Sequence, residues 1–266
     1  MIGVTQLIGD LQPPAEPAIA TNGLITRLES FNQGYSSSTT QWDDLSGNNN
    51  HFTKAGNVAL TTYGGVPDVW YFTGGYFNFK RPSDNANNGF GVFNNDNYTI
   101  EIWVNYVSQY ASLATPWLWS YDYIQHSSPY YYQSLKIAGY ANTAFSAYNG
   151  GTSGSTDISG GNWYQLVVTR TGGSSPRGKA YLNGVETNAA TNATREILYG
   201  YGRNTAFDAG YNQEAWIGRG NYGSYEGSYT SFLKGAIGIV RIYDREISAA
   251  EVLQNYNANK DHFNLT

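Results

Sequence analysis

The chain has 266 residues, no cysteine and a formal net charge of −5, from 15 Lys and Arg against 20 Asp and Glu. A chain of this length can bury a core without disulfides, and the lack of cysteine excludes thiol catalysis and cysteine-based zinc sites. The acidic balance, without a basic stripe, argues against nucleic acid as a partner. Aromatic residues make up 16% of the chain, which disordered proteins do not show, so a folded body is expected.

The N-terminal segment, residues 1–22, differs from the rest. It contains Pro13, Pro14 and Pro17 and no alternating pattern long enough for a strand, so we predict an extended arm that docks on a neighbouring subunit. A loose tail is the alternative. The given chain shows no signal peptide, and no apolar run approaches the ~18 residues that a membrane span needs. Residues 23–266 are predicted to form one domain.

Short strand patterns separated by turn residues fill this domain. The clearest is residues 98–107, which place Ile100, Ile102 and Val104 on one face and Glu101 and Trp103 on the other. Residues 31–51 are rich in Ser, Thr, Asn and Gly and are predicted to form a long loop. Many short strands indicate a sandwich or a barrel. The other predicted strands are residues 23–29, 68–72, 76–79, 116–121, 135–140, 144–148, 163–170, 179–182, 185–187, 215–217 and 236–243.

Two short sequence motifs predict where a hairpin turns and where a helix begins. Asn183-Gly184 between two strand patterns predicts a tight hairpin, because both residues tolerate positive φ. Ser248, followed three residues later by Glu251, predicts a capping box that begins a helix over residues 249–258.

Several segments, in this order, resemble the laminin-G-like and concanavalin A-like jelly-roll domains. They are residues 42–48 (WDDLSGN), 70–75 (WYFTGG), 98–104 (YTIEIWV), 163–170 (WYQLVVTR) with 181–184 (YLNG), and 235–251. The resemblance extends over residues 24–263. It implies an all-β fold, a two-sheet antiparallel jelly-roll sandwich with one short C-terminal helix. Members of this family bind glycans, mediate adhesion or serve as structural modules.

Catalytic groups are not indicated. A glycosidase needs two carboxyl groups set close together, one as the acid and one as the nucleophile or base. Glu101 has Thr99 and Trp103 as its neighbours on the same strand face, and no strand pattern offers alternating acids. The three histidines are far apart and show no metal-ligand spacing. We therefore predict no catalytic residues and no enzyme activity.

A calcium site is the metal candidate. The loop at residues 43–50 offers the hard oxygen ligands that Ca²⁺ prefers, and the resemblance implies a structural calcium in such a loop. The candidate ligands are Asp43, Asp44, Ser46 and Asn48. Gly238 stands where many relatives carry Asp, which removes one partner ligand. The alternative is that Asp44 and Ser46 hydrogen-bond their own turn, and no other cofactor is expected.

Tyrosines among Gly, Asn and Ser are the candidate carbohydrate-binding groups, because flat rings stack on the apolar faces of sugars. Rings within strands belong more often to the core, and loop tyrosines serve protein interfaces equally well. The candidates are Tyr121, Tyr130, Tyr132, Tyr222, Tyr225 and Tyr229.

Together these features favour a non-enzymatic virion protein, such as a phage decoration, tail or fibre component. Such a protein would lie on a virion or another extracellular surface. It would contact the protein subunits of a larger assembly, form oligomers through the N-terminal arm, and contact host glycans. One alternative is a secreted or surface carbohydrate-binding module of a bacterium, and another is a glycoside hydrolase.

Overall fold

The computed structural model describes residues 18–80, 97–107, 117–123, 132–138, 144–148, 152–155, 158, 160–171, 177–187, 213–221 and 230–266. From residue 117 to residue 155 it describes the backbone of the strands. Within these ranges, no helix is long and apolar enough to cross a membrane.

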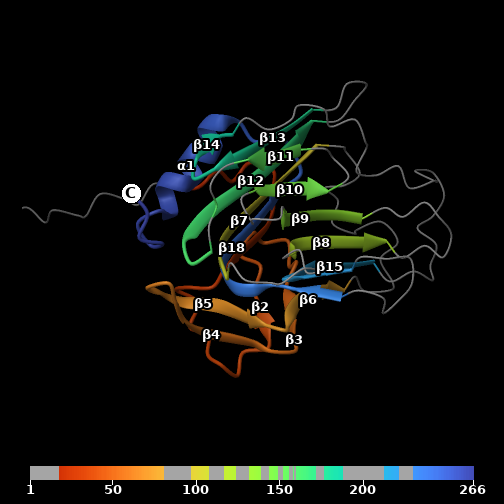
Figure 1. The fold of residues 1–266 in the computed structure, drawn as a ribbon, viewed down its shortest axis with the longest axis vertical. Coiled ribbons are helices and arrows are strands. Elements are labelled where there is room, and N and C mark those ends of the chain that lie inside the picture. The colour runs from red at the N-terminus through yellow and green to blue at the C-terminus, as the bar shows by residue number, and fades with distance from the viewer. Residues whose placement is uncertain are drawn as a thin grey trace, which may run out of the picture.

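The described residues form two antiparallel sheets that pack face to face (Figure 1). Sheet A has the strand order β14-β13-β12-β7-β18-β5-β4, and β1 also pairs with β18. Its strands are β1 (Leu24–Glu29), β4 (Val58–Tyr63), β5 (Val66–Thr73), β7 (Tyr98–Tyr106), β12 (Trp163–Thr171), β13 (Arg177–Leu182), β14 (Val185–Glu186) and β18 (Lys234–Tyr243).

Sheet B has the order β11-β10-β9-β8-β15-β6-β3-β2. Its strands are β2 (Gln41–Trp42), β3 (Phe52–Ala55), β6 (Tyr76–Lys80), β8 (Trp117–Tyr123), β9 (Tyr132–Ala138), β10 (Ala144–Tyr148), β11 (Thr152–Ser155) and β15 (Gln213–Ile217). A separate two-stranded ribbon joins β16 (Arg219–Asn221) and β17 (Thr230–Phe232). The predicted all-β sandwich is confirmed.

The prediction of one long loop over residues 31–51 was wrong in part. The two-residue strand β2 lies within it, and the side chain of Trp42 in that strand is completely buried. Strands β3 and β4 were also missed. Their apolar alternation is weak because polar residues such as Lys54 and Thr61 interrupt it. These segments form strands nonetheless, because they pair with β6 and β5.

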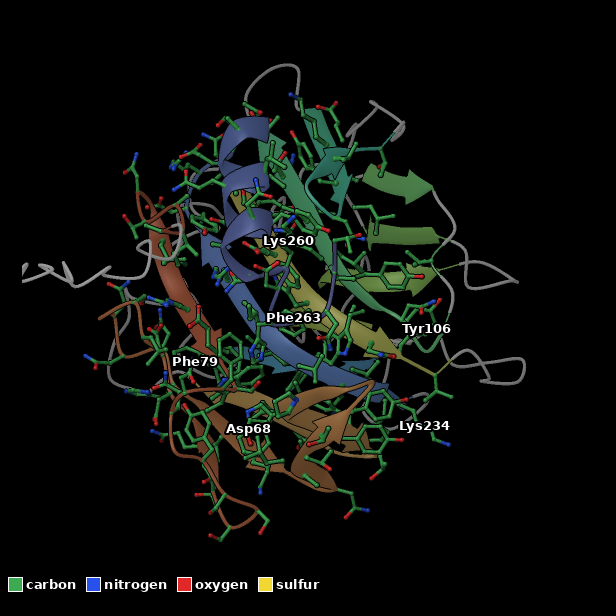
Figure 2. All side chains as sticks on the ribbon, turned by 90° about the vertical axis from the view of Figure 1, so that its left-hand side faces the viewer. Asp68, Phe79, Tyr106, Lys234, Lys260 and Phe263 are labelled. Atoms are coloured by element: carbon green, nitrogen blue, oxygen red, sulfur yellow. The ribbon has the colours of Figure 1, made fainter. Side chains whose placement is uncertain are left out.

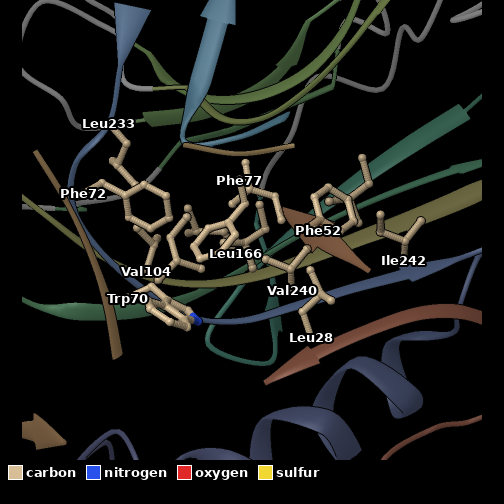
Figure 3. Close-up of a cluster of buried hydrophobic side chains, with 14 of the residues drawn as sticks. Leu28, Phe52, Trp70, Phe72, Phe77, Val104, Leu166, Leu233, Val240 and Ile242 are labelled. Atoms are coloured by element: carbon tan, nitrogen blue, oxygen red, sulfur yellow. The ribbon is translucent and has the colours of Figure 1, made fainter. Parts of the chain in front are cut away.

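Apolar side chains from both sheets fill the space between them (Figure 3). Ile100, Ile102 and Val104 of β7 point into this interior, as the alternation predicted. Other members are Leu28, Phe52, Trp70, Phe72, Phe77, Leu166, Val240 and Ile242.

Sheet A is also covered on its opposite face, by helix α1 (Ala249–Asn259) and the C-terminal segment that follows it (Figure 2). Phe263 is 1% exposed, and its ring stacks on Trp103 at 4.6 Å and meets Trp163 at 4.8 Å between ring centroids. A second apolar core therefore lies behind sheet A. The central strands of sheet A, β7, β12 and β18, are buried on both faces.

The predicted hairpin and helix start are confirmed. Asn183 and Gly184 both have positive φ, 50° and 80°, as a tight hairpin turn requires. Ser248 Oγ accepts a hydrogen bond from the Glu251 amide at 3.3 Å, and the Glu251 carboxylate accepts one from the Ser248 amide at 2.8 Å. The capping box begins α1 at Ala249.

Gly238 lies where the pairing of β18 with β7 shifts register, between Ile237 and Ile239. The irregularity resets the alternation, so that Ile237 and Val240 both point into the sandwich interior. A Cβ atom on Gly238 would lie 2.6 Å from the ring of Phe263. The position where the resemblance leads us to expect an Asp therefore has no space for a side chain.

Replacing Phe263 by Ala should lower the free energy of unfolding by about 3–5 kcal/mol, because it opens a cavity between two buried tryptophans. Urea unfolding measures this change. Leu253→Ala in the same C-terminal region is the matched control: Leu253 is 45% exposed, and we expect little change. Equal losses in both variants would contradict a second core behind sheet A.

Candidate functional site

Asp44, the central residue of the predicted calcium loop, is 7% exposed and fully occupied by hydrogen bonds. Its Oδ1 accepts from the amides of Arg27 and Ser46 at 2.8 and 2.9 Å. Its Oδ2 accepts from Ser46 Oγ at 2.8 Å and from the Asn50 amide at 2.9 Å. Both carboxylate oxygens thus stabilise the turn itself and its junction with β1.

The same loop covers the free edge of β1. The carbonyl of Ile25 accepts from Ser46 Oγ at 3.0 Å, from Asn48 Nδ2 at 3.1 Å and from Asn50 Nδ2 at 2.7 Å. The Leu45 amide donates to the Arg27 carbonyl at 2.7 Å. Side chains here replace a neighbouring strand, which protects an edge against pairing with other chains.

Two other predicted calcium ligands, Asn48 and Asp43, also form hydrogen bonds with neighbouring groups of the protein. Asn48 Nδ2 donates to the Ile25 carbonyl of β1 at 3.1 Å and to Ser46 Oγ in the loop at 3.0 Å, and Asp43 Oδ1 accepts from Gln41 Nε2 at 2.6 Å. No cluster of three His, Asp or Glu side chains in the described part of the chain could hold a metal ion. The geometry therefore favours the turn alternative, and the calcium site stays a prediction.

Asp44→Ala should lower the free energy of unfolding by about 2 kcal/mol, because it leaves buried amides without an acceptor. The melting temperature in calcium and in a chelator should be the same. Asp43→Ala, at an exposed neighbouring carboxylate, is the control and should change stability little. A calcium-dependent rise in melting temperature that Asp44→Ala abolishes would contradict this account.

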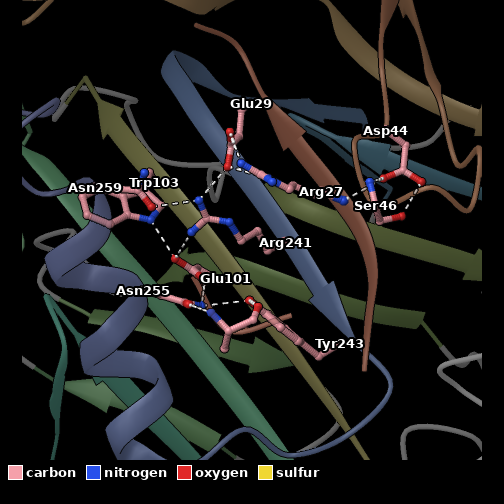
Figure 4. A network of polar contacts seen from close by, with 11 residues as sticks. Arg27, Glu29, Asp44, Ser46, Glu101, Trp103, Arg241, Tyr243, Asn255 and Asn259 are labelled. Carbon is pink, nitrogen blue, oxygen red and sulfur yellow. Dashed lines mark hydrogen bonds and ion pairs between the residues drawn. The ribbon is translucent and has the colours of Figure 1, made fainter. Parts of the chain in front are cut away.

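Glu101 lies at the centre of a buried polar network between sheet A and α1 (Figure 4). Its Oε1 accepts from Trp103 Nε1 at 2.8 Å, from Gln165 Nε2 at 2.9 Å and from Arg241 Nη1 at 3.0 Å. Its Oε2 accepts from Asn255 Nδ2 of α1 at 2.7 Å. The side chain is completely buried, so no substrate in solution reaches this carboxylate.

Arg241 connects Glu101 with a second acid. Its Nη2 donates to Glu29 Oε1 at 2.7 Å and to Asn259 Oδ1 at 2.8 Å. Arg27 Nε also donates to Glu29, at 2.9 Å. Burial by itself raises the pKa of Glu29, but the charges and hydrogen bonds of Arg241 and Arg27 outweigh burial and hold this pKa below its usual range.

The network continues to the end of the predicted N-terminal arm. Asn255 Oδ1 accepts from the amide of Ala20 at 2.8 Å, and Tyr243 OH donates to the Ala20 carbonyl at 3.1 Å. The described residues of the arm, 18–22, thus contact α1 and β18 of their own chain. The preceding residues, including Pro13, Pro14 and Pro17, lie outside the described residues.

Glu101→Gln should lower the free energy of unfolding by about 3–5 kcal/mol, because it leaves the Arg241 guanidinium buried with only one carboxylate partner. Denaturant unfolding measures the loss. The double variant Glu101→Met with Arg241→Met removes both charges and should be more stable than the sum of the single changes predicts. Additive losses would contradict direct coupling of the two side chains.

The outer face of sheet B carries a cluster of rings around one cation. Ala215 and Ile217 point into the interior of the sandwich. The side chain of Trp216 between them therefore lies on the outer face of sheet B, where it is 3% exposed. The guanidinium of Arg219 lies 4.8 Å from the ring centroids of both Trp216 and Tyr76. Phe232 of β17 stacks on Tyr76 at 6.3 Å between centroids.

On the two strands that neighbour β15, the positions paired with Trp216 carry polar residues. Trp216 pairs with Ser120 of β8 on one side and with Asn78 of β6 on the other. Two residues earlier, Glu214 pairs with Asp122 and with Lys80. Directly opposed residues in an antiparallel pair have Cβ atoms about 4.5–5.5 Å apart. The register therefore brings together two acids that lie about ninety positions apart in the sequence.

Most of the predicted sugar-binding tyrosines lie outside the residues that the structure describes. Tyr130, Tyr222, Tyr225 and Tyr229 are outside the described residues. Tyr121 and Tyr132 lie in β8 and β9, where the backbone alone is described, and the register partner of Tyr121 is the buried Ala215. These six residues stay predictions.

The outer face of sheet B was not predicted from the sequence. Trp216 stood in a recognised strand, but nothing in the sequence indicated that β15 lies between β6 and β8. That order decides which residues flank Trp216. The opposed acids Asp122 and Glu214 were missed for the same reason, because they lie in different strands and only the pairing of β15 with β8 brings them opposite each other.

Residues 72–253 match a family model described as "Concanavalin A-like lectin/glucanases superfamily". Among curated protein sequences, none matches this chain.

Solved structures share the fold at low sequence identity. A sialidase from Trypanosoma rangeli in complex with sialic acid is similar with a TM-score of 0.61 and 16% identity, over 92% of this chain and 34% of that chain. This chain thus spans about a third of that sialidase. Domain 4 of AbnA, an extracellular GH43 arabinanase from Geobacillus stearothermophilus, in complex with arabinotriose, is similar with a TM-score of 0.53 and 19% identity, over 88% of this chain and 98% of that domain.

Proposed function

The chain belongs to the concanavalin A-like lectin/glucanase superfamily, and on this basis we propose that it is a non-catalytic carbohydrate-binding domain. The observation that carries the proposal is the outer face of sheet B. There, the half-buried ring of Tyr76 lies against the guanidinium of Arg219, and the buried Trp216 beside them pairs in register with Ser120 and Asn78. Rings that stack on a sugar, next to side chains that hydrogen-bond its hydroxyls, are the groups that a glycan site requires.

Two further findings support the proposal. Domain 4 of the arabinanase, which this chain matches over almost the whole domain, has a structure in complex with arabinotriose. Glu101, the acid in the clearest strand, is occupied by Trp103, Gln165, Arg241 and Asn255 and serves the fold.

Binding to a glycan array, followed by titration of the best ligand, tests the proposal. Tyr76→Ala should weaken the affinity about tenfold or more, because it removes a ring from the outer face of sheet B. Tyr71→Ala is the matched control, since Tyr71 is also a half-buried strand tyrosine but lies in sheet A, where its ring stacks on Tyr63. No binding on the array, or equal losses in the two variants, would overturn the assignment to sheet B.

The predicted loop tyrosines are tested in the same assay. Tyr222→Ala, Tyr225→Ala and Tyr229→Ala, made singly and together, should weaken binding if the loop contributes to the site. Unchanged affinity in the triple variant would remove these tyrosines from the site and leave the sheet face as the binding surface.

A glycoside hydrolase is the second candidate, and the register of Asp122 with Glu214 favours it. Two carboxyl groups about 5–5.5 Å apart suit a retaining mechanism. A panel of polysaccharides tests this candidate with Asp122→Asn and Glu214→Gln. Hydrolysis that both variants abolish would overturn the non-catalytic proposal, and no hydrolysis by the unmodified protein would support it.

A role as a virion decoration, tail or fibre protein is a finer proposal for the same domain. Its support is the Tyr, Asn, Gly and Ser composition and the proline-bearing segment at residues 1–22. Mass spectrometry of purified particles from the source of the gene tests it. Absence of the protein from such particles would leave the proposal of a secreted or surface-bound carbohydrate-binding module.

A further inference from the structure

Two Asn-Gly dipeptides lie within the described residues, Asn22-Gly23 and Asn183-Gly184. Asparagine before glycine is the pair that loses its side-chain amide most easily, because glycine has no Cβ to hinder its own backbone nitrogen. That nitrogen attacks the Cγ atom of the asparagine, so the nitrogen and the side chain must both be free to move. The fold gives this freedom to one dipeptide and withholds it from the other.

Asn183-Gly184 is held in place by Gln165. The Gly184 amide donates to Gln165 Oε1 at 2.9 Å, and Asn183 Oδ1 accepts from the Gln165 amide at 2.9 Å. Gly184 is buried, and a Cβ atom on it would lie 3.0 Å from Leu253 Cδ1. The attacking nitrogen and the asparagine side chain are both engaged, so reaction at this dipeptide requires that the hairpin opens locally.

Asn22-Gly23 lacks these restraints. Asn22 is exposed, and within the described part of the chain its side chain forms no hydrogen bond and the Gly23 amide has no acceptor. The dipeptide occupies the two central positions of a turn, which the Leu24 amide closes on the Thr21 carbonyl at 3.1 Å. Gly23 has a φ of 72°, and a Cβ atom on it would lie 2.5 Å from Asp244 Oδ1. The turn therefore requires glycine directly after this exposed asparagine.

We propose that Asn22-Gly23 is a site of spontaneous deamidation in the folded protein. The Gly23 nitrogen gives its proton to a base in the solvent and forms a bond to Asn22 Cγ. The bond from Cγ to Nδ2 breaks, and Nδ2 takes a proton from water and leaves as ammonia, so that a cyclic imide remains. Water then opens the imide at one of its two carbonyl carbons. Opening at Cγ gives aspartate, and opening at the backbone carbonyl gives isoaspartate, in which the main chain passes through the former side chain.

Formation of isoaspartate changes how the N-terminal residues are attached to the end of β18. Arg245 Nε donates to the Asn22 carbonyl at 2.8 Å, and the Asp244 amide donates to the Gly23 carbonyl at 2.9 Å. Isoaspartate converts the first of these carbonyls into a free carboxylate and adds one carbon atom to the chain before Gly23. The two hydrogen bonds are then no longer spaced by one peptide unit, so residues 18–22 lose their alignment with the rest of the domain.

Incubation of the full chain in a mildly alkaline buffer, followed by peptide mapping for isoaspartate, tests the proposal. In the folded protein, conversion at Asn22 should be at least about tenfold faster than at Asn183, because Asn183 reacts only in molecules whose hairpin is open. In urea the two sites should react at similar rates, since glycine follows both. Asn22→Gln should block conversion at the first site, because the longer side chain closes a six-membered ring far more slowly. Equal rates in the folded protein, or a faster reaction at Asn183, would overturn the proposal.

Amide hydrogen exchange measures the effect on the N-terminal residues. The converted protein, separated by ion exchange, should exchange the Ala20 amide faster, because its hydrogen bond to Asn255 Oδ1 depends on the alignment of residues 18–22. The Gly184 amide is the internal control and should keep its protection. The variant Asn22→Gln, incubated in the same way, should show no change at either amide. Unchanged exchange at Ala20 in the converted protein would overturn the link between deamidation and this attachment.

The inference is independent of the proposed glycan site. Failure of Asn22 to convert leaves glycan binding as proposed, and failure of every glycan to bind leaves the chemistry of Asn22 unchanged. The two proposals are therefore tested separately.

Discussion

The ion pair between Glu101 and Arg241 is the interaction on which the rest of this structure depends. It joins β7 to β18 in direct register, and Glu29, Asn255 and Asn259 extend it to β1 and α1. Helix α1 can exclude water from the outer face of sheet A only because each of these charges has a partner there. The contacts of Ala20 with Asn255 and Tyr243 attach the N-terminal residues to the same network.

Burial of sheet A on both faces constrains where function can reside. Phe263, Trp103 and Tyr256 fill the space behind this sheet, so its broad surface is not open to a ligand. The outer face of sheet B and the ends of the sandwich remain. The proposed glycan site lies on that outer face, at the ring cluster around Trp216 and Tyr76.

Two features of the family resemblance have a physical account in this chain. The acidic loop forms hydrogen bonds with the backbone groups at the exposed edge of β1. Asp44 accepts from backbone amides, and Asn50 Nδ2 donates to the Ile25 carbonyl. Gly238 leaves the space that the ring of Phe263 occupies. The carboxylate oxygens of Asp44 accept hydrogen bonds from the turn, and the space beside Gly238 is filled by a packed ring.

The sequence by itself determined the fold class, most strands, the Asn183-Gly184 hairpin and the capped start of α1. These features depend on residues close together in the chain, where alternation, positive φ and capping act locally. Only the tertiary structure decided that Glu101 is buried beneath α1 and that Asp122 lies opposite Glu214. Each of these depends on which distant strands pair and what covers them, and that outcome is set by the packing of the whole chain.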